Sequence, residues 1–256
     1  MRPAHFLNVL LAAAALALAS VATGADTAEE LIQKGNVFYD KLQPAEALKY
    51  YLPAEQLAPD NAGLLVRIAR QYRHLMSDAP KLEEKIRLGA VAVKYADRAV
   101  ALAPNDPEAQ LAVAISYAKL LPFQSNKEQF NNSRVIKAAA DKVIALDPGN
   151  DLGWTVLGRW YFNVAGVGGL KRIAAQTFFG KLPSAKYEDA VRCFEKAIEL
   201  KPKRVMHYVE LGRTYAVMGK TAEARKFISK GLALPDTEKD DPETKRQGRE
   251  ILQQLH

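Results

Sequence analysis

Large and small apolar residues recur along the chain at helical spacing, in runs that end at similar proline-containing phrases. The phrases are QLAPDN, ALAPND, ALDPGN and ELKPKR, with prolines at Pro59, Pro104, Pro148 and Pro202. Because proline cannot continue a helix, each phrase predicts a helix end followed by the start of the next helix. The pattern therefore predicts an all-helical chain built from repeated units.

One stretch carries the signature of a known helix pair. The segment GWTVLGRWYF has the spacing W-x2-L-G-x2-Y at Trp154, Leu157, Gly158 and Tyr161. The segment YEDAVRCFEKAIELKP supplies the second half at Ala190, Phe194, Ala197 and Pro202. These are the two halves of a tetratricopeptide repeat, in which large residues fill the gap between helices while Gly and Ala permit close approach.

The same frame recurs elsewhere in the chain. Further copies begin near Leu31, Leu65, Gln110 and Tyr208. The polar stretch DDPETKRQGREILQQL then predicts a final helix that caps the open end of the stack. We therefore expect an all-α, tetratricopeptide-like superhelix of about five helix pairs with a C-terminal capping helix, forming one domain over residues 26–256.

Three repeats are longer than the standard unit. Repeats two, three and four exceed the usual spacing by about 11, 10 and 20 residues. The largest insertion, at about residues 163–185, includes the apolar, glycine-containing stretch NVAGVGGLKRIAAQTFFGKLPSAK. It is too apolar for an ordinary solvated loop, which favours a short extra helix at about residues 170–179 folded over the array. A face that touches a membrane or a partner is the other interpretation.

The N-terminal segment, residues 1–25, has the layout of a secretory signal peptide. Arg2 precedes an uncharged apolar stretch, and small residues follow where a protease could cut after Ala22 or Ala25. An uncleaved membrane anchor is the alternative, although the stretch is short and rich in alanine. Either interpretation predicts an exported protein, most simply in a bacterial periplasm.

The composition predicts a basic surface and excludes an internal disulfide. The 256 residues are 48% hydrophobic and 25% charged, with a net charge of +7, as expected of a globular chain. The excess charge favours anionic partners, or simply reflects solvated lysine-bearing helix faces. Cys193 is the single cysteine, so an internal disulfide is excluded, and its helical context predicts a small core residue.

The chain from about Leu31 to Leu255 resembles the regulator of microtubule dynamics protein family. The resemblance rests on LLVRIARQYR, on YADRAVALAPND and above all on the span from LDPGNDLGWTVLGRWYF through the insertion to LPSAKYEDAVRCFEKAIEL. It implies an all-helical adaptor. Family members are associated with microtubules, with mitochondrial or reticulum membranes and, in one branch, with phospholipid. An exported protein would meet no microtubules, so we expect the fold and an interaction role to carry over, but not the ligand.

The repeat frame also predicts a binding surface. In tetratricopeptide superhelices the first helix of each pair lines the concave groove, and the residue after the signature glycine points into it. We applied this rule to all five repeats and added the residue four positions later, which lies one helical turn further along the same face. The residues with side-chain hydrogen-bond donors at these positions are the candidate binding residues Arg70, His74, Lys119, Arg159, Asn163, Arg213 and Asn36.

Arginine offers a planar fork for carboxylate or phosphate. The groove is therefore predicted to bind an acidic peptide or partner protein, with an anionic phospholipid as the alternative. The competing interpretation is that each arginine only pairs with a neighbouring carboxylate. Of the aromatic residues in GWTVLGRWYF, Trp154 and Tyr161 are expected in the core, whereas Trp160 could face either the groove or the insertion.

Catalysis finds little support in the sequence. The four histidines are scattered, and no pair has metal-ligand spacing on a helix. The stretch AGVGGL lacks the preceding strand and the glycine spacing of a dinucleotide fold. Basic runs with interleaved aromatic residues, typical of nucleic-acid binding, are missing as well. We therefore expect a non-enzymatic protein without cofactor, metal or nucleic-acid partner.

Overall fold

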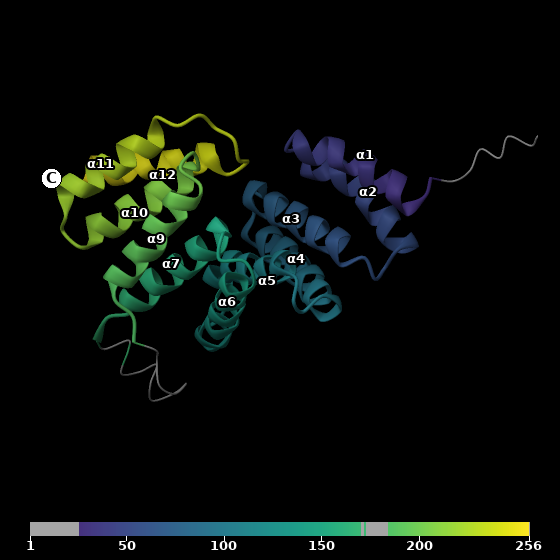
Figure 1. Ribbon diagram of the computed structural model, residues 1–256, viewed down its shortest axis with the longest axis horizontal. Coiled ribbons are helices and arrows are strands. Elements are labelled where there is room, and N and C mark those ends of the chain that lie inside the picture. The colour runs from purple at the N-terminus through teal and green to yellow at the C-terminus, as the bar shows by residue number, and fades with distance from the viewer. Residues whose placement is uncertain (1–25, 170–171, 173–183, 256) are drawn as a thin grey trace, which may run out of the picture.

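The computed structural model describes residues 26–169, 172 and 184–255 (Figure 1). The predicted signal segment lies outside the described residues, as does nearly all of the helix expected at about residues 170–179.

The described residues form five helix pairs and a final helix, which confirms the expected all-α repeat architecture. The pairs are α1 (Ala28–Asp40) with α2 (Pro44–Leu57), α3 (Ala62–Asp78) with α4 (Leu82–Leu102), α5 (Pro107–Leu120) with α6 (Asn126–Leu146), α7 (Asp151–Ala165) with α9 (Tyr187–Leu200), and α10 (Val205–Val217) with α11 (Thr221–Leu232). A short 3-10 turn, Leu121–Phe123, follows α5, and α12 (Asp241–Gln254) ends the array.

The proline-containing phrases end one helix and cap the next. In PDN, PND and PGN, a side chain accepts a hydrogen bond from a backbone N–H in the first turn of the following helix. The capping residues are Asn61, Asp106 and Asn150. These side chains satisfy backbone donors that have no partner within the helix, so the helix starts are determined locally.

The extra length of the second and third repeats lies in their helices rather than in long loops. Helices α4 and α6 each have 21 residues, against 14 in α2. The longer α4 carries an additional buried position, Leu88, whereas the buried residues of α6 all lie at Ile136 or later.

Signature glycines allow the two helices of a pair to touch. A Cβ atom added to Gly158 would lie 2.7 Å from the ring of Phe194 on α9, and one added to Gly35 would lie 2.4 Å from the ring of Tyr51 on α2. Both rings are fully buried. Glycine is therefore required at these two crossings because any side chain would overlap the partner helix.

The two tryptophans of α7 differ in how deeply they are buried. Trp154 is only partly buried, and its indole N–H donates to the backbone oxygen of Pro148 at 3.0 Å. Trp160 is 5% exposed, and its indole N–H donates to the backbone oxygen of Ser133 on α6 at 2.9 Å. Trp154 therefore packs against the core at its edge, whereas the packing of α7 on α6 encloses Trp160. Cys193 is buried as expected.

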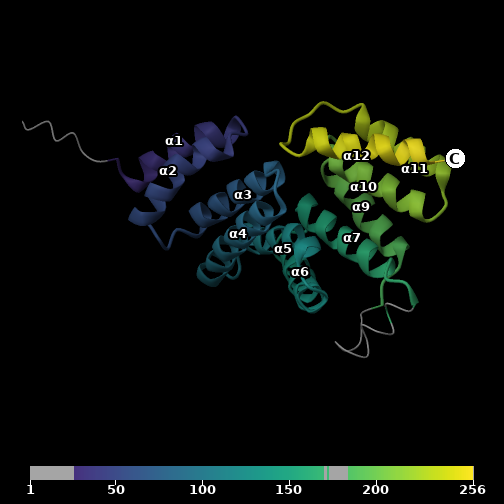
Figure 2. The ribbon, with the colours of Figure 1, turned by 180° about the vertical axis from the view of Figure 1, so that it is seen from behind.

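The helix pairs follow an arc from α1–α2 to α11–α12 (Figures 1 and 2). Helix α12 packs against α10 and α11, as expected of a cap. The connection between α11 and α12 reaches back toward α3, where Glu238 approaches Arg70. Within the described part of the chain, no helix combines the length and the apolar character needed to cross a bilayer.

Candidate functional site

A cavity of about 290 Å³ is bounded mainly by the first helices of the pairs. Helices α3, α5 and α7 form most of its wall, and α1, α6, α10 and the α11–α12 connection complete it. The cavity therefore lies on the side of the array that the repeat frame assigns to the groove. One end of it is closed by the α11–α12 connection, which is far from α3 and α5 in the sequence.

The cavity has an apolar part and a charged part. The apolar lining includes Leu111, Ile115, Ile136, Val156, Trp160 and Val164. The cationic lining residues are Arg67, Arg70, Arg73, Lys119, Arg159, Arg204 and Lys239, and the carboxylates are Glu108, Glu238, Asp240 and Asp241. Three of these cations also pair with carboxylates just outside the lining, Arg159 with Glu210, Arg204 with Asp151 and Lys239 with Asp78.

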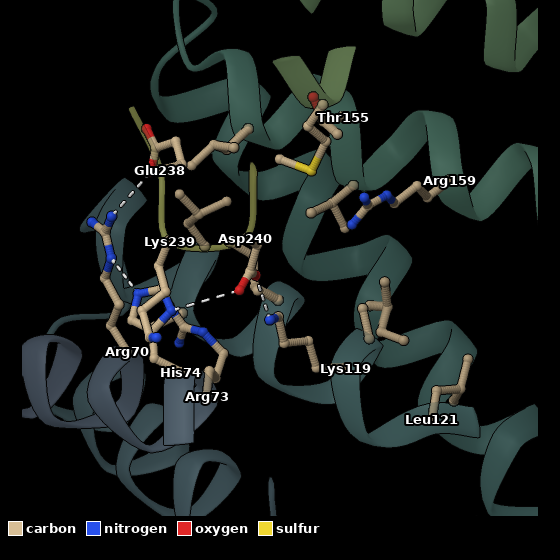
Figure 3. A pocket seen from close by; sticks show the side chains of 18 of the residues that line it. Arg70, Arg73, His74, Lys119, Leu121, Thr155, Arg159, Glu238, Lys239 and Asp240 are labelled. Atoms are coloured by element: carbon tan, nitrogen blue, oxygen red, sulfur yellow. Dashed lines mark hydrogen bonds and ion pairs between the residues drawn. The ribbon is translucent and has the colours of Figure 1, made fainter. Parts of the chain in front are cut away.

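Residues 236–241, which we call the acidic strap, lie across the charged part of the cavity (Figure 3). Asp240 accepts a hydrogen bond from the Lys119 ammonium at 2.6 Å. Glu238 lies 3.4 Å from the Arg70 guanidinium and 3.0 Å from that of Arg204. The strap therefore joins the C-terminal unit to α3 and α5.

The strap is held in shape from the side of α12. The buried carboxylate of Asp241 accepts backbone N–H bonds from Thr237 at 2.8 Å and Glu238 at 2.7 Å. The Thr244 hydroxyl donates to the backbone oxygen of Asp240 at 2.8 Å. These local bonds fix the backbone turn that presents the side chains of Glu238 and Asp240 to the cavity.

Arg73 is a buried cation in the cavity wall. Its guanidinium donates to the Ser116 hydroxyl at 3.0 Å, and in the described part of the chain no carboxylate lies within ion-pair distance of it. Burial, assisted by the neighbouring charge of Arg70, lowers the pKa of Arg73 to about 10, so the group stays charged at neutral pH. A buried charge without a counter-charge is costly, which makes this position receptive to an anion.

Asp240 sits between His74 and Lys119. Burial lowers the pKa of His74 to about 4, although Asp240 opposes the shift, so the ring is neutral at pH 7. Burial also lowers the pKa of Lys119, and Asp240 partly offsets this effect. Burial works to raise the pKa of Asp240, but Lys119 and His74 outweigh it and hold that pKa below its usual value.

Arg159 and Arg213 share a buried carboxylate, Glu210 on α10. The guanidinium of Arg159 lies 2.7 Å from Glu210, and that of Arg213 lies 2.6 Å from it. Burial would raise the pKa of Glu210, but the two arginines outweigh it and lower that pKa. Arg213 also stacks on the ring of Phe162, with 4.1 Å between guanidinium carbon and ring centre.

The structure brings five of the seven candidate residues together. The residues that line the cavity are Arg70, His74, Lys119, Arg159 and Asn163. Arg213 lies outside the lining because Glu210 and Phe162 hold its side chain. Asn36 also lies outside, since α1 is at the end of the array and the Asn36 amide oxygen accepts from the Tyr51 hydroxyl at 2.8 Å. A binding role for these residues stays a prediction.

Sequence comparison agrees with this architecture. The protein-family model described as Regulator of microtubule dynamics protein 1-3 matches residues 28–256. The chain belongs to this family. Regulator of microtubule dynamics protein 2 of Macaca fascicularis is 26% identical over 197 residues, covering 77% of this chain and 48% of that protein. Regulator of microtubule dynamics protein 1 of Mus musculus is 26% identical over 227 residues, covering 88% and 73%. The chain thus spans about half the length of the protein 2 relatives.

Solved structures show the same fold. A thermophilic tetratricopeptide repeat protein of Thermus thermophilus superposes with a TM-score of 0.64 at 15% identity, covering 89% of this chain and all of that one. MamA residues 41 to the end, from Desulfovibrio magneticus, superposes with a TM-score of 0.51 at 16% identity, covering 82% and 96%. At these identities the likeness shows the fold alone, a tetratricopeptide-like array of helix pairs.

The charged part of the cavity in this family member includes residues that the repeat frame did not select. Glu238 and Asp240 belong to a loop, Arg204 precedes α10, and Arg73 lies on α3 beside His74. The acidic run TEKDD was visible in the sequence, but nothing local indicated which surface it would meet. No metal-binding group of three or more His, Cys, Asp or Glu residues occurs in the described ranges.

Proposed function

We propose that this member of the regulator of microtubule dynamics protein family is a non-enzymatic adaptor that holds an acidic segment of a partner protein in its cavity. The observation that carries the proposal is Arg73, a buried cation of the lining that has no carboxylate partner among the described residues. Guanidinium and ammonium groups bind carboxylates through short, charge-assisted hydrogen bonds. The repeat fold supports a protein or peptide as the partner.

A labelled acidic peptide tests the proposal. The variant R70Q/K119Q/R159Q removes three lining cations without creating new negative charge. We expect it to bind a fluorescein-labelled peptide of alternating Glu and Ser at least about tenfold more weakly than the unmodified chain, because each lost charge-assisted bond contributes roughly 1.5–3 kcal/mol. Fluorescence anisotropy titration measures the affinity.

The matched control is K94Q/K127Q/K142Q, which removes the same charge from exposed positions on α4 and α6. Retained affinity in this control, with melting temperatures close to wild type in both variants, would locate the binding in the cavity. An equal loss in both variants would mean that only net charge attracts the peptide, and the proposed site would be wrong.

The apolar part of the cavity favours a second candidate, an anionic phospholipid with its chains against Ile115, Val156 and Trp160. Native mass spectrometry of the protein purified from its own host separates the two, since co-purified phospholipid is expected only if this second proposal holds.

We also propose that the protein is exported, because residues 1–25 have the layout of a signal peptide. Amino-terminal sequencing of the protein from its host tests it, and a mature start at Thr23 or Asp26 would support it. The relatives are named for the regulation of microtubule dynamics. Microtubules are a partner to consider only if the chain stays in the cytosol.

A further inference from the structure

We infer that the acidic strap is an internal ligand, which occupies the cations that an acidic partner segment would use and must be displaced when the partner binds. The inference rests on the proposed function and adds to it a regulatory step and a chemical description of the partner. It is argued from the ion pairs that the strap makes with the cavity.

Three successive side chains of the strap each meet a side chain of opposite charge. Glu238 faces Arg70, and Asp240 faces Lys119 (Figure 3). Glu238 also pairs with Arg204 at 3.0 Å. Between Glu238 and Asp240, the ammonium of Lys239 turns to Asp78 at the end of α3, at 2.9 Å. A short acid, base, acid sequence therefore finds a complementary partner at each of its three positions.

The contacts across the cavity are of a kind that a competitor can replace. The side chains of Arg70 and Glu238 are 35% and 32% exposed, and those of Lys119 and Asp240 are 27% and 41% exposed. Ion pairs at this level of exposure are weak and are screened by salt, so the contacts to Arg70 and Lys119 are the ones that a competitor replaces first. The contact of Glu238 with Arg204 is more enclosed, because the Arg204 side chain is 14% exposed and also pairs with Asp151. Asp241, at the α12 end of the strap, is 2% exposed and accepts from the backbone N–H groups of Thr237 and Glu238, so residues 237–241 can keep their turn and move as one unit about the start of α12.

The strap also indicates what the partner looks like. A displacing segment needs two carboxylates separated by one residue, to meet the cations that now hold Glu238 and Asp240. A basic residue between them would match Asp78. Because an external segment can also reach Arg73, which the strap leaves without a carboxylate, it can gain a contact that the strap does not make.

The free strap sequence is a suitable probe. A fluorescein-labelled peptide with the sequence of residues 234–243, LPDTEKDDPE, is titrated into the full chain and into the full-chain variant E238Q/D240N. Removing the internal carboxylates should free the cations, so we expect the variant to bind the peptide about tenfold more tightly. The control variant E46Q/E199Q removes two carboxylates that form exposed ion pairs within α2 and α9, and it should bind as the unmodified chain does.

The outcomes separate the inference from the proposed function. If the strap variant binds no more tightly than wild type while R70Q/K119Q/R159Q binds more weakly, the cavity binds acidic segments but the strap does not compete. If none of these variants differs from wild type, the proposed function fails as well. A peptide carrying Gln and Asn in place of Glu238 and Asp240 should bind poorly to every variant.

A distance measurement on the otherwise unaltered strap provides an independent test. Spin labels are attached in the variant T237C/E83C, whose two sites are exposed. The native Cys193 is buried with a thiol pKa raised to about 12 by burial, and should not react. Addition of saturating peptide should lengthen the distance between the labels. An unchanged distance with peptide bound would overturn the inference.

Discussion

His74 is a neutral histidine enclosed by charged side chains from three elements. Arg70 and Arg73 lie on its own helix, Lys119 approaches from α5, and Asp240 approaches from the strap. Its side chain is 13% exposed, so protonation would place a poorly solvated charge beside three cations. This position is therefore expected to make the stability of the protein depend on pH.

The sign of that dependence follows from proton binding. The unfolded chain takes up a proton at His74 near its ordinary pKa of about 6.5, whereas the folded chain does so only near a pKa of about 4. The unfolded state therefore binds more protons in this window, and the free energy of unfolding decreases as the pH falls from about 6.5 to about 4. We expect H74Q to lose a contribution to this slope on the order of 1 kcal/mol per pH unit.

Urea unfolding of wild type and H74Q at several pH values measures the difference. His207, whose pKa burial also lowers, is present in both proteins and cancels in the comparison. Identical slopes for the two proteins would contradict this account of His74.

The signature glycine of a repeat allows the two helices of a pair to pack closely. At Gly158, a Cβ atom would lie within 3.0 Å of three ring atoms of Phe194, whose ring is fully buried. We expect G158A to lower the free energy of unfolding by about 1–2 kcal/mol, since the overlap outweighs the better helix propensity of alanine. Chemical denaturation followed by tryptophan fluorescence measures it.

G63A is the matched control for G158A. Gly63 is also helical, but it is exposed, and an added Cβ would meet only the Asn61 side-chain oxygen at 3.5 Å. This variant should gain up to about 1 kcal/mol from helix propensity. Equal destabilisation in the two variants would show that close approach of the helices is not the cause.

The described helix pairs follow one another in an array, with the strap as a further link from the C-terminal unit to α3 and α5, so the first pair need not unfold together with the rest. Helices α1 and α2 pack on the rest of the array mainly through α2 against α3. In such arrays stability is close to a sum of unit and interface terms. A local defect at the first pair should therefore remain local.

The variant G35A tests this, since a Cβ there would lie 2.4 Å from the Tyr51 ring. Both tryptophans, Trp154 and Trp160, lie on α7 and report only the centre, whereas circular dichroism reports all helices. In G35A, circular dichroism should begin to change at a lower urea concentration than tryptophan fluorescence. Coincident transitions would show that the array unfolds as one cooperative unit.

Most of the architecture could be predicted from local patterns. Asn61, Asp106 and Asn150 cap helices within three residues, and the partners Gly158 and Phe194 lie on successive helices of one repeat. Because such interactions join residues that are close along the chain, their spacing in the sequence is enough to place the helices, their pairing and the final cap.

The candidate site could be predicted only in part by the same reasoning. The repeat frame selected Arg70 and Lys119, but it could not show that Glu238 and Asp240 would meet them from 168 and 121 positions further along the chain. Nor could it show that Glu210 would hold Arg213 away from the cavity, or that α7 would bury Trp160 rather than Trp154. These features depend on how successive pairs rotate about one another, and small rotations summed over five pairs decide which distant side chains come into contact.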